Sequence, residues 1–372
     1  MASTTKHQRL DTGISRSSFD PELRELKQAA FSVEGTSTAG FTIPWDDPAL
    51  GGKKFQVYGN ANCSIYSAAA CNGNCPFCVE KVRPASKGSR LAEVKRNIDD
   101  GTYFAALDKA LQLVRPLDPS ISITGGEPSI DPRLPTIIAL VQKHGFRKRT
   151  ITTNGSGLLK NGLVPMLVAG GFEHLNISRA HADEARNQAI MQVDAPLTNA
   201  NLCRVIALTR GTILRPRLSC VLLRGEIDCL DAITAYLDWA AGIGVDNVVF
   251  RQLMAFDPAR CAADPAISFS EGHRVMLDPI LREIYQDPAD HHHAFTFTKQ
   301  VVGYYYYIEV YKYIQKRGKA IDVVFENADL RFIDRDREVP RRIPLVHELV
   351  FHASGTLNST WLPGEGIVAK FA

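Results

Sequence analysis

Three cysteines lie close together in one short stretch of the chain. Cys71, Cys75 and Cys78 form a C-x3-C-x2-C pattern among Asn, Gly and Pro residues, which favour a loop over regular structure. Thiolates this close on a loop can turn inward and bind one soft metal centre. A zinc site normally takes four protein ligands, and only three cysteines cluster here. The pattern therefore fits an iron–sulfur cube with one iron left for another ligand, and a non-catalytic, zinc-binding α/β protein is the alternative from a different class.

The residue before the last cysteine is the aromatic Phe77. With it the motif reads C-x3-C-x-aromatic-C, which resembles the hallmark of the radical S-adenosylmethionine superfamily. The resemblance of the chain to that superfamily spans roughly residues 60 to 255. The resemblance implies a [4Fe-4S] cluster held by the three cysteines, with S-adenosylmethionine chelating the fourth iron. It also implies reductive cleavage to a 5′-deoxyadenosyl radical that takes hydrogen from a substrate, with electrons from an external donor such as flavodoxin or ferredoxin.

A second motif, Gly125-Gly126-Glu127-Pro128, directly follows the β-branched run Ser120–Thr124. Two glycines let backbone carbonyls approach an ammonium group with no Cβ in the way. By the resemblance, the turn formed by Gly125, Gly126 and Glu127 binds the amino group of the methionine cofactor. The alternative is that Gly125 to Pro128 form an ordinary turn without a ligand.

Two later segments resemble the molybdenum-cofactor cyclase branch of the superfamily. Thr152 to Gly155 resembles its T-N-G segment and Asn176 to Ser178 its N-x-S segment, which hold the ribose and carboxylate of the cofactor. The branch often continues with Leu and Asp where this chain has Arg179 and Ala180. The predicted cofactor-binding residues outside the glycine turn are Phe77, Thr152, Asn154, Ser178, Arg179 and Arg251.

Two further residues, His181 and Glu309, are predicted to take part in catalysis. Arg179, His181 and Arg251 could hold a carboxylate or phosphate, and His181 could also shuttle a proton near neutral pH. Alternation along a tyrosine-rich run places Glu309 on one face with Tyr305 and Tyr307, and we expect that face to point into the cavity. The alternatives are a structural histidine and tyrosines that only pack.

These residues need a scaffold, and apolar runs alternate with amphipathic segments through most of the chain. Strands are predicted at Phe55–Gly59, Ser64–Ala70, Ser120–Thr124, Arg149–Thr153, Leu175–Ser178, Arg217–Leu223 and Asn247–Arg251. Helices are predicted at Leu107–Leu117, Leu134–His144, Leu158–Ala169, Asp183–Gln192, Asn199–Arg210 and Leu230–Ala241, with a last one between Ser270 and Tyr285. Counting from Ser64, this predicts an α/β fold with an incomplete (β/α)6 TIM-type barrel, whose chemistry gathers at the carboxyl ends of the strands.

The chain is expected to divide into three parts. Residues 1–54 form a largely irregular N-terminal extension with one short helix from about Pro21 to Phe31, and residues 55–290 form the partial barrel. Residues 291–372 form a mostly β C-terminal extension that caps the barrel. Its predicted strands are Tyr304–Tyr313, Ile321–Phe325, Leu345–His352 and Thr356–Leu362. The triple histidine His291–His293 is read as a surface loop.

Composition limits the class of partner. Of the 372 residues 45% are hydrophobic and 22% charged, and the net charge is +3, so neither a nucleic-acid nor a membrane surface is expected. There is no apolar run of the length that a membrane helix needs, and the first twenty residues do not look like a secretory signal. The other cysteines are scattered and suggest no disulfide framework, so a reducing cytoplasm is expected.

The scattered cysteines also limit the chemistry. Cys63, Cys203, Cys220, Cys229 and Cys261 form no second C-x-x-C pair, and no cysteine follows Asp264. A single cluster is therefore predicted, without a second centre to accept an electron from the substrate. This favours rearrangement, elimination or epimerisation of a small polar substrate in the barrel mouth. A radical enzyme that matures a peptide or protein is the alternative within the superfamily.

Overall fold

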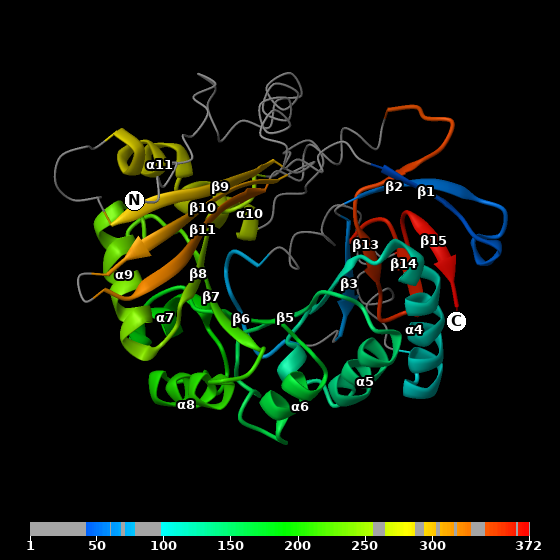
Figure 1. Ribbon diagram of the computed structural model, residues 1–372, viewed down its shortest axis with the longest axis horizontal. Helices are drawn as coiled ribbons and strands as arrows, with labels where there is room; N and C mark the ends of the chain where they lie inside the picture. The colour runs from blue at the N-terminus through cyan, green and yellow to red at the C-terminus, as the bar shows by residue number, and fades with distance from the viewer. Residues whose placement is uncertain are drawn as a thin grey trace, which may run out of the picture.

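A twelve-stranded mixed sheet forms the centre of the chain in the computed structural model (Figure 1). The structure describes residues 42–59, 61–67, 71–78, 98–255, 265–286, 294–302, 306–315, 318–328, 339–361 and 364–371. The predicted helix from Pro21 to Phe31 and the triple histidine His291–His293 lie outside these residues.

Six parallel strands lie side by side, in chain order, in the middle of this sheet. They are β3 (Asn62–Tyr66), β4 (Ser120–Thr124), β5 (Arg149–Thr153), β6 (His174–Ser178), β7 (Arg215–Val221) and β8 (Asn247–Arg251). The helices between them are α4 (Asp100–Val114), α5 (Leu134–His144), α6 (Leu163–Ala169), α7 (Glu184–Met191), α8 (Asn199–Thr209) and α9 (Leu230–Ile243). Figure 1 shows these helices on the outer, convex side of the sheet, and the predicted α/β class is confirmed.

Most of these boundaries follow from local signals. The Asp99 side chain accepts a hydrogen bond from Thr102 N (2.9 Å) and caps the start of α4. Gly145, at φ +66°, ends α5 in the left-handed conformation that glycine adopts without strain. The prediction was wrong at the start of α6, which begins at Leu163, because Asn161 and Gly162 both have positive φ and turn the chain there.

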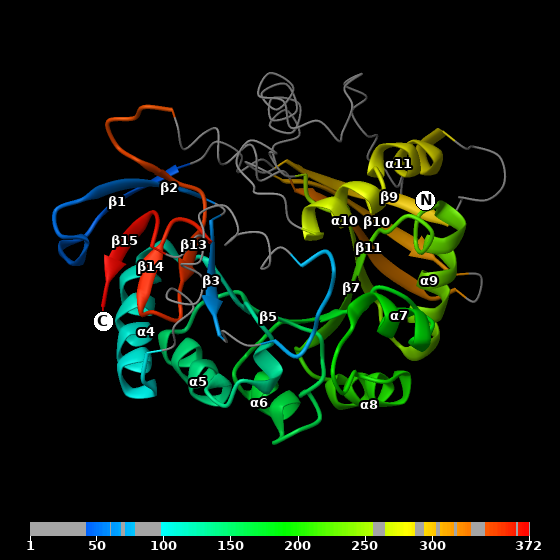
Figure 2. The ribbon, with the colours of Figure 1, turned by 180° about the vertical axis from the view of Figure 1, so that it is seen from behind.

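The C-terminal strands extend the same sheet at both edges instead of forming a sheet of their own. On one edge β11 (Ala320–Ala328) pairs in parallel with β8, and β10 (Tyr306–Ile314) and β9 (Phe295–Val302) follow antiparallel. On the other edge β13 (Leu349–Phe351) pairs in parallel with β3, and β14 (Thr356–Asn358) and β15 (Ile367–Lys370) follow. The prediction treated residues 291–372 as a cap and counted six parallel strands. The structure has eight in one run, because β11 and β13 pair with the two edges that six strands alone would leave exposed. Figure 2 shows the two groups at opposite ends of an open arc.

A second, three-stranded sheet lies beside this arc. It contains β1 (Thr42–Asp46), β2 (Lys54–Tyr58) and β12 (Leu345–Val346), and a short 3-10 helix, Pro48–Leu50, joins β1 to β2. The expectation of irregular structure before residue 54 was wrong for β1, where Trp45 is buried and pairs with Phe55. The predicted strand Leu345–His352 is also divided, because β12 belongs to the small sheet and β13 to the large one.

The last predicted helix is two helices, α10 (Pro265–His273) and α11 (Leu277–Gln286). They separate where Arg274 forms an isolated antiparallel bridge with Leu223 and donates to the carbonyl of Leu253. Among the residues that the structure describes, no helix combines the length and apolar character needed to cross a bilayer.

Side chains of the central strands alternate between two faces of the sheet. On the helix-covered face, fully buried residues such as Ile65, Ile123, Ile177, Leu218 and Phe250 join one hydrophobic core. We call the opposite, concave side the inner face. Polar residues predominate there on β4 to β8, among them Ser122, Thr152, Asn176, Ser178, Arg217 and Arg251. The fold thus separates an apolar core from a polar surface suited to bind a polar ligand.

Candidate functional site

The cysteine loop lies beyond the end of β3 and is held by the segment that follows α7. Gly73 forms an isolated antiparallel bridge with Val193. On either side of it, Asn74 N donates to Gln192 O (2.9 Å) and Asp194 N donates to Asn72 O (2.8 Å). A loop rich in Asn and Gly thus obtains its backbone partners from a segment more than a hundred residues later.

Asn72, directly after the first cysteine, ties the loop to two other segments. Its Nδ2 donates to Asp194 O (2.6 Å) and to Ser156 Oγ (3.1 Å). Its Oδ1 accepts from Nδ2 of Asn154 (2.9 Å), which follows β5. Asn72 was not among the predicted site residues, although its place inside the C-x3-C motif could have drawn attention to it.

The cysteines differ in their surroundings. Cys71 is exposed, whereas Cys75 and Cys78 are partly buried. Cys75 Sγ lies 3.1 Å from Met191 O, and both Cys75 and Phe77 pack against a small apolar cluster that includes Met191. The Phe77 ring also lies 6.3 Å from that of Phe269 on α10. The role predicted for Phe77 stays a prediction, and what the structure adds is an apolar wall beside the loop.

The Gly125–Gly126 turn lies at the end of β4, the strand next to β3. Both residues have positive φ, +82° and +59°. A Cβ on Gly125 would lie 2.5 Å from Cδ2 of Tyr66, so only glycine fits there. The turn therefore brings bare backbone to the same edge of the sheet as the cysteine loop.

Glu127 of this turn is 1% exposed and directs its carboxylate into the protein. Oε1 accepts from Ser129 N (2.8 Å) and from the Thr153 hydroxyl, and Oε2 accepts from Asn154 N (2.6 Å). Burial raises the pKa of the Glu127 carboxyl, and the hydrogen bonds from Ser129, Thr153 and Asn154 oppose that shift. Its side chain thus fixes the turn after β4 to the turn after β5.

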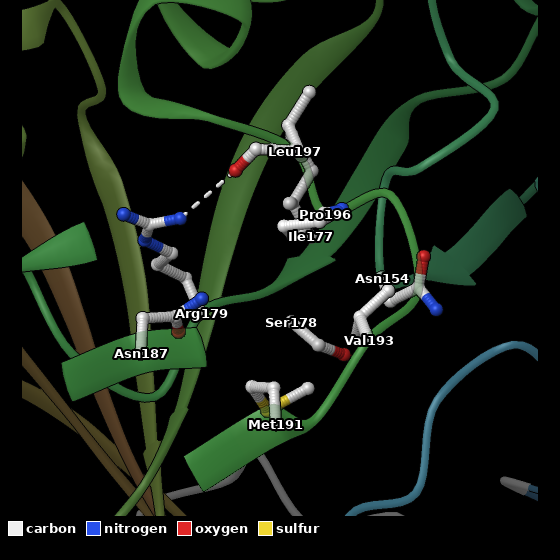
Figure 3. Close-up of a pocket in the computed structure, with 9 residues that line it drawn as sticks. All are labelled: Asn154, Ile177, Ser178, Arg179, Asn187, Met191, Val193, Pro196 and Leu197. Atoms are coloured by element: carbon white, nitrogen blue, oxygen red, sulfur yellow. Dashed lines mark hydrogen bonds between the residues drawn. The ribbon is translucent and has the colours of Figure 1, made fainter. Parts of the chain in front are cut away.

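Asn154 and Ser178 line one small pocket at the ends of β5 and β6 (Figure 3). Met191, Val193 and Leu197 supply its apolar lining. The segment that holds the cysteine loop therefore also forms a wall of this pocket. The structure brings these two predicted cofactor-binding residues together beside the predicted cluster site.

Arg179 also borders the pocket, but its guanidinium is bound elsewhere. It donates from Nε to His181 O (3.0 Å), from Nη1 to Leu197 O (3.0 Å) and from Nη2 to Asn199 Oδ1. Figure 3 shows it turned toward Leu197 and away from Ser178. Burial lowers its pKa. The structure gives Arg179 a structural role in place of the predicted cofactor contact, because backbone carbonyls of the following turn take its donors.

His181 is half-buried and lies outside the residues that line the pocket. Its Nδ1 accepts from Asp183 N (2.9 Å), just before α7. Burial and the nearby Arg186 lower its pKa, so the imidazole is neutral near pH 7. One ring nitrogen is therefore used to shape a turn, and the catalytic role stays a prediction.

The position of Glu309 contradicts the prediction that its side chain points into the cavity. It pairs in register with Phe325 of β11, and Phe325 belongs to the helix-side core. Directly paired residues share a face, so Glu309 points away from the inner face. It is fully buried and accepts from the hydroxyls of Tyr307 (2.5 Å) and Tyr311 (2.6 Å). The alternation of side chains correctly predicted that Tyr307 and Glu309 share one face of β10. It could not reveal whether that face points to the inner face of the sheet or to the core.

Arg251 lies on the inner face with a second arginine that the prediction missed. Its Nη2 lies 3.3 Å from Glu326 Oε2, and its buried Nε has no hydrogen-bond partner among the described residues. Arg217 on β7 donates from Nε to Asn176 Oδ1 (2.7 Å), and Asn176 Nδ2 donates to Thr152 Oγ1 (3.2 Å). Burial, and then the nearby Arg251, lower the pKa of Arg217 to about 10. Its position directly before the core residue Leu218 could have marked it as lying on the inner face.

The donor set suits the cofactors that the resemblance implies. Three thiols lie on one loop, and a glycine turn free of Cβ atoms and a pocket with hydroxyl and amide groups lie at neighbouring strand ends. Within the described ranges no three His, Cys, Asp or Glu side chains converge as ligands of one metal ion. Cys71, Cys75 and Cys78 would hold a cluster by their thiolates, and this assignment stays a prediction.

Comparison with known proteins gives partial matches. No family model matches the chain. It is 32% identical over 175 residues to GTP 3′,8-cyclase of Stenotrophomonas maltophilia (strain K279a), a match covering 46% of this chain and 49% of that protein. It is 26% identical over 218 residues to molybdenum cofactor biosynthesis protein 1 of Homo sapiens, covering 57% of this chain and 31% of that protein. The chain therefore spans half, or less, of the length of these relatives.

A solved structure of Streptococcus suis SuiB bound to S-adenosylmethionine is similar with a TM-score of 0.47 and 13% identity, covering 92% of this chain and 66% of that one. That similarity is too low to support an argument about this chain. The cysteine motif and the sequence similarity to the cyclases are separate observations that lead to the same group of proteins. Both observations support the resemblance of the chain to the radical S-adenosylmethionine superfamily.

Proposed function

We propose that the chain is a radical S-adenosylmethionine enzyme with a single [4Fe-4S] cluster and a (β/α)6 catalytic core formed by β3 to β8. One observation carries this proposal: Asn72 and Asn154 join the three-cysteine loop to the strand ends where Glu127 also anchors the glycine turn. When bound, the cluster and its cofactor supply a carbon-centred radical for hydrogen abstraction. Cys71, Cys75 and Cys78 would hold the cluster, and the Gly125–Gly126 turn would face the methionine amino group.

The inner face supports a small substrate with an anionic group. Arg251 lies close enough to Arg217 to lower its pKa, and Glu326 is the carboxylate that accompanies them. Two guanidinium groups with one carboxylate leave a positive charge to bind a carboxylate or phosphate. GTP is the first anion to test, because one relative is named GTP 3′,8-cyclase.

The test uses anaerobically reconstituted enzyme with S-adenosylmethionine and dithionite, with 5′-deoxyadenosine measured against a panel of substrates. The panel contains nucleotides, sugar phosphates, carboxylic acids, neutral sugars and peptides. An increase in 5′-deoxyadenosine with one anionic class supports the proposal. An increase with peptides alone supports the peptide-maturing alternative, and none with any compound contradicts both.

Two arginines of β7 provide a matched pair for the substrate site. Arg217→Gln should raise KM for the anionic substrate about ten- to hundredfold, because a charge-assisted hydrogen bond is lost. Arg215→Gln is the control, since Arg215 is already paired with Asp246 (2.8 Å) and Asp322 (2.7 Å). Equal effects of the two variants on KM would contradict this location.

A further inference from the structure

The C-terminal segment brings His352 beside Tyr66 at the edge of the sheet that carries the site. In the parallel pairing of β13 with β3, Phe351 lies opposite Ile65, and both belong to the helix-side core. The residues that follow them, His352 and Tyr66, therefore lie on the inner face at the carboxyl ends of their strands. Figure 1 shows β13 next to β3.

The Tyr66 ring occupies the space directly against the glycine turn. A Cβ built on Gly125 would lie 2.5 Å from Cδ2 and 2.7 Å from both Cε2 and Cγ of that ring. The His352 ring stacks on Tyr66 at 6.2 Å with an interplanar angle of 24°, and the Trp361 ring meets Tyr66 edge-on at 6.5 Å. Tyr66 is 4% exposed and His352 is 3% exposed. The turn thus lies against the Tyr66 ring, and two rings from the C-terminal segment pack on Tyr66.

Hydrogen bonds hold these rings in place. His352 Nε2 lies 3.1 Å from Thr360 O, and Trp361 Nε1 donates to Glu348 Oε2 (2.8 Å). On the β3 side, the Tyr103 hydroxyl donates to the backbone oxygen of Tyr66 (3.3 Å) and so fixes the main chain from which that ring extends. Rings fixed in this way leave the turn little freedom to move toward them.

We propose that Tyr66 and His352 are positioning residues for S-adenosylmethionine, because their stacked rings fix the position of the Gly125–Gly126 turn. This inference rests on the proposed function, in which the backbone of that turn receives the methionine amino group. The C-terminal segment, which carries no cysteine, then contributes to cofactor affinity through the turn. A displacement of about 1 Å in such a site can change a rate about a hundredfold.

The test measures the Kd of S-adenosylmethionine by anaerobic calorimetry, together with the change that the cofactor causes in the EPR spectrum of the reduced cluster. Tyr66→Leu and His352→Leu should weaken binding about ten- to hundredfold and reduce the spectral change, with iron content unchanged. Tyr66→Phe, which keeps the ring, should stay within about threefold of wild type. His144→Leu is the matched control, since His144 lies at the end of α5 and bonds Asp108 at 2.7 Å.

Each outcome supports or overturns the inference. Wild-type affinity in both leucine variants overturns it and leaves the proposed function intact. Loss of iron in both variants also overturns it, because the stack would then act on the cysteine loop. If Tyr66→Leu does not fold, His352→Leu decides the question alone. Reconstituted wild type that binds no S-adenosylmethionine contradicts the proposed function and this inference with it.

Discussion

Among single residues, Glu127 links the chemistry of the site most closely to its folding. One buried carboxylate accepts donors from the turns after two neighbouring strands. Glutamine has the same shape but only one acceptor oxygen, and its NH2 would face a backbone N–H. Glu127→Gln should therefore lower the free energy of unfolding by about 1–3 kcal/mol, measured by urea titration.

The same variant gives a pH test. Because burial raises the folded-state pKa of Glu127 above its ordinary value of 4.5, the folded chain binds more protons than the unfolded chain between those two values. The stability that this group contributes is thus largest at low pH and falls as pH rises through the folded pKa. The difference in unfolding free energy, wild type minus Glu127→Gln, should decrease from pH 4.5 upward. A difference that grows with pH would contradict this assignment.

Asn72 is expected to control how firmly the loop holds its cluster. Asn72→Ala removes three side-chain hydrogen bonds, to Asp194, Ser156 and Asn154. We expect iron to be lost to a chelator several-fold faster, because a freer loop opens more often. Asn62→Ala is the control, since the Asn62 side chain donates within its own strand, to Ser64 Oγ (2.8 Å), at the other end of β3. Equal rates of iron loss in both variants would contradict the role of Asn72.

At the scale of elements, β10 shows that a residue's face decides its role. Glu309 lies among core residues, so Glu309→Gln should lower the free energy of unfolding by about 1–3 kcal/mol through its bonds to Tyr307 and Tyr311. The release of 5′-deoxyadenosine per folded molecule should stay at the wild-type level. A large loss of that activity in fully folded Glu309→Gln would restore the catalytic role.

The sequence alone predicted the central strands well, because β-branched runs such as Ser120–Thr124 and caps such as Gly145 are local signals. It also predicted that Asn154 and Ser178 would lie at neighbouring strand ends. The direction of Glu309 toward the helix-side core could not be predicted, since it depends on which strands pair. The contacts of Arg179 could not be predicted either, because its partners His181, Leu197 and Asn199 lie outside the strands. Strand pairing between residues far apart also explains why the places of β11 and β13 were missed.

At the scale of the whole molecule, distant segments meet at one edge of one sheet. The cysteine loop, the strand-end turns and the segment after α7 are joined by hydrogen bonds there. The C-terminal strands complete the sheet on both sides of this core. The inner face therefore lies on a sheet whose strands come from residues 62 to 370, and its polar character on β4 to β8 distinguishes it from the helix-covered core.

The most direct test of this account is the release of 5′-deoxyadenosine after reduction of the reconstituted enzyme with S-adenosylmethionine present. Wild type loaded with about four irons per chain should release it, and Cys75→Ala should release none. Wild type that holds a full complement of iron and still releases no 5′-deoxyadenosine would contradict the account.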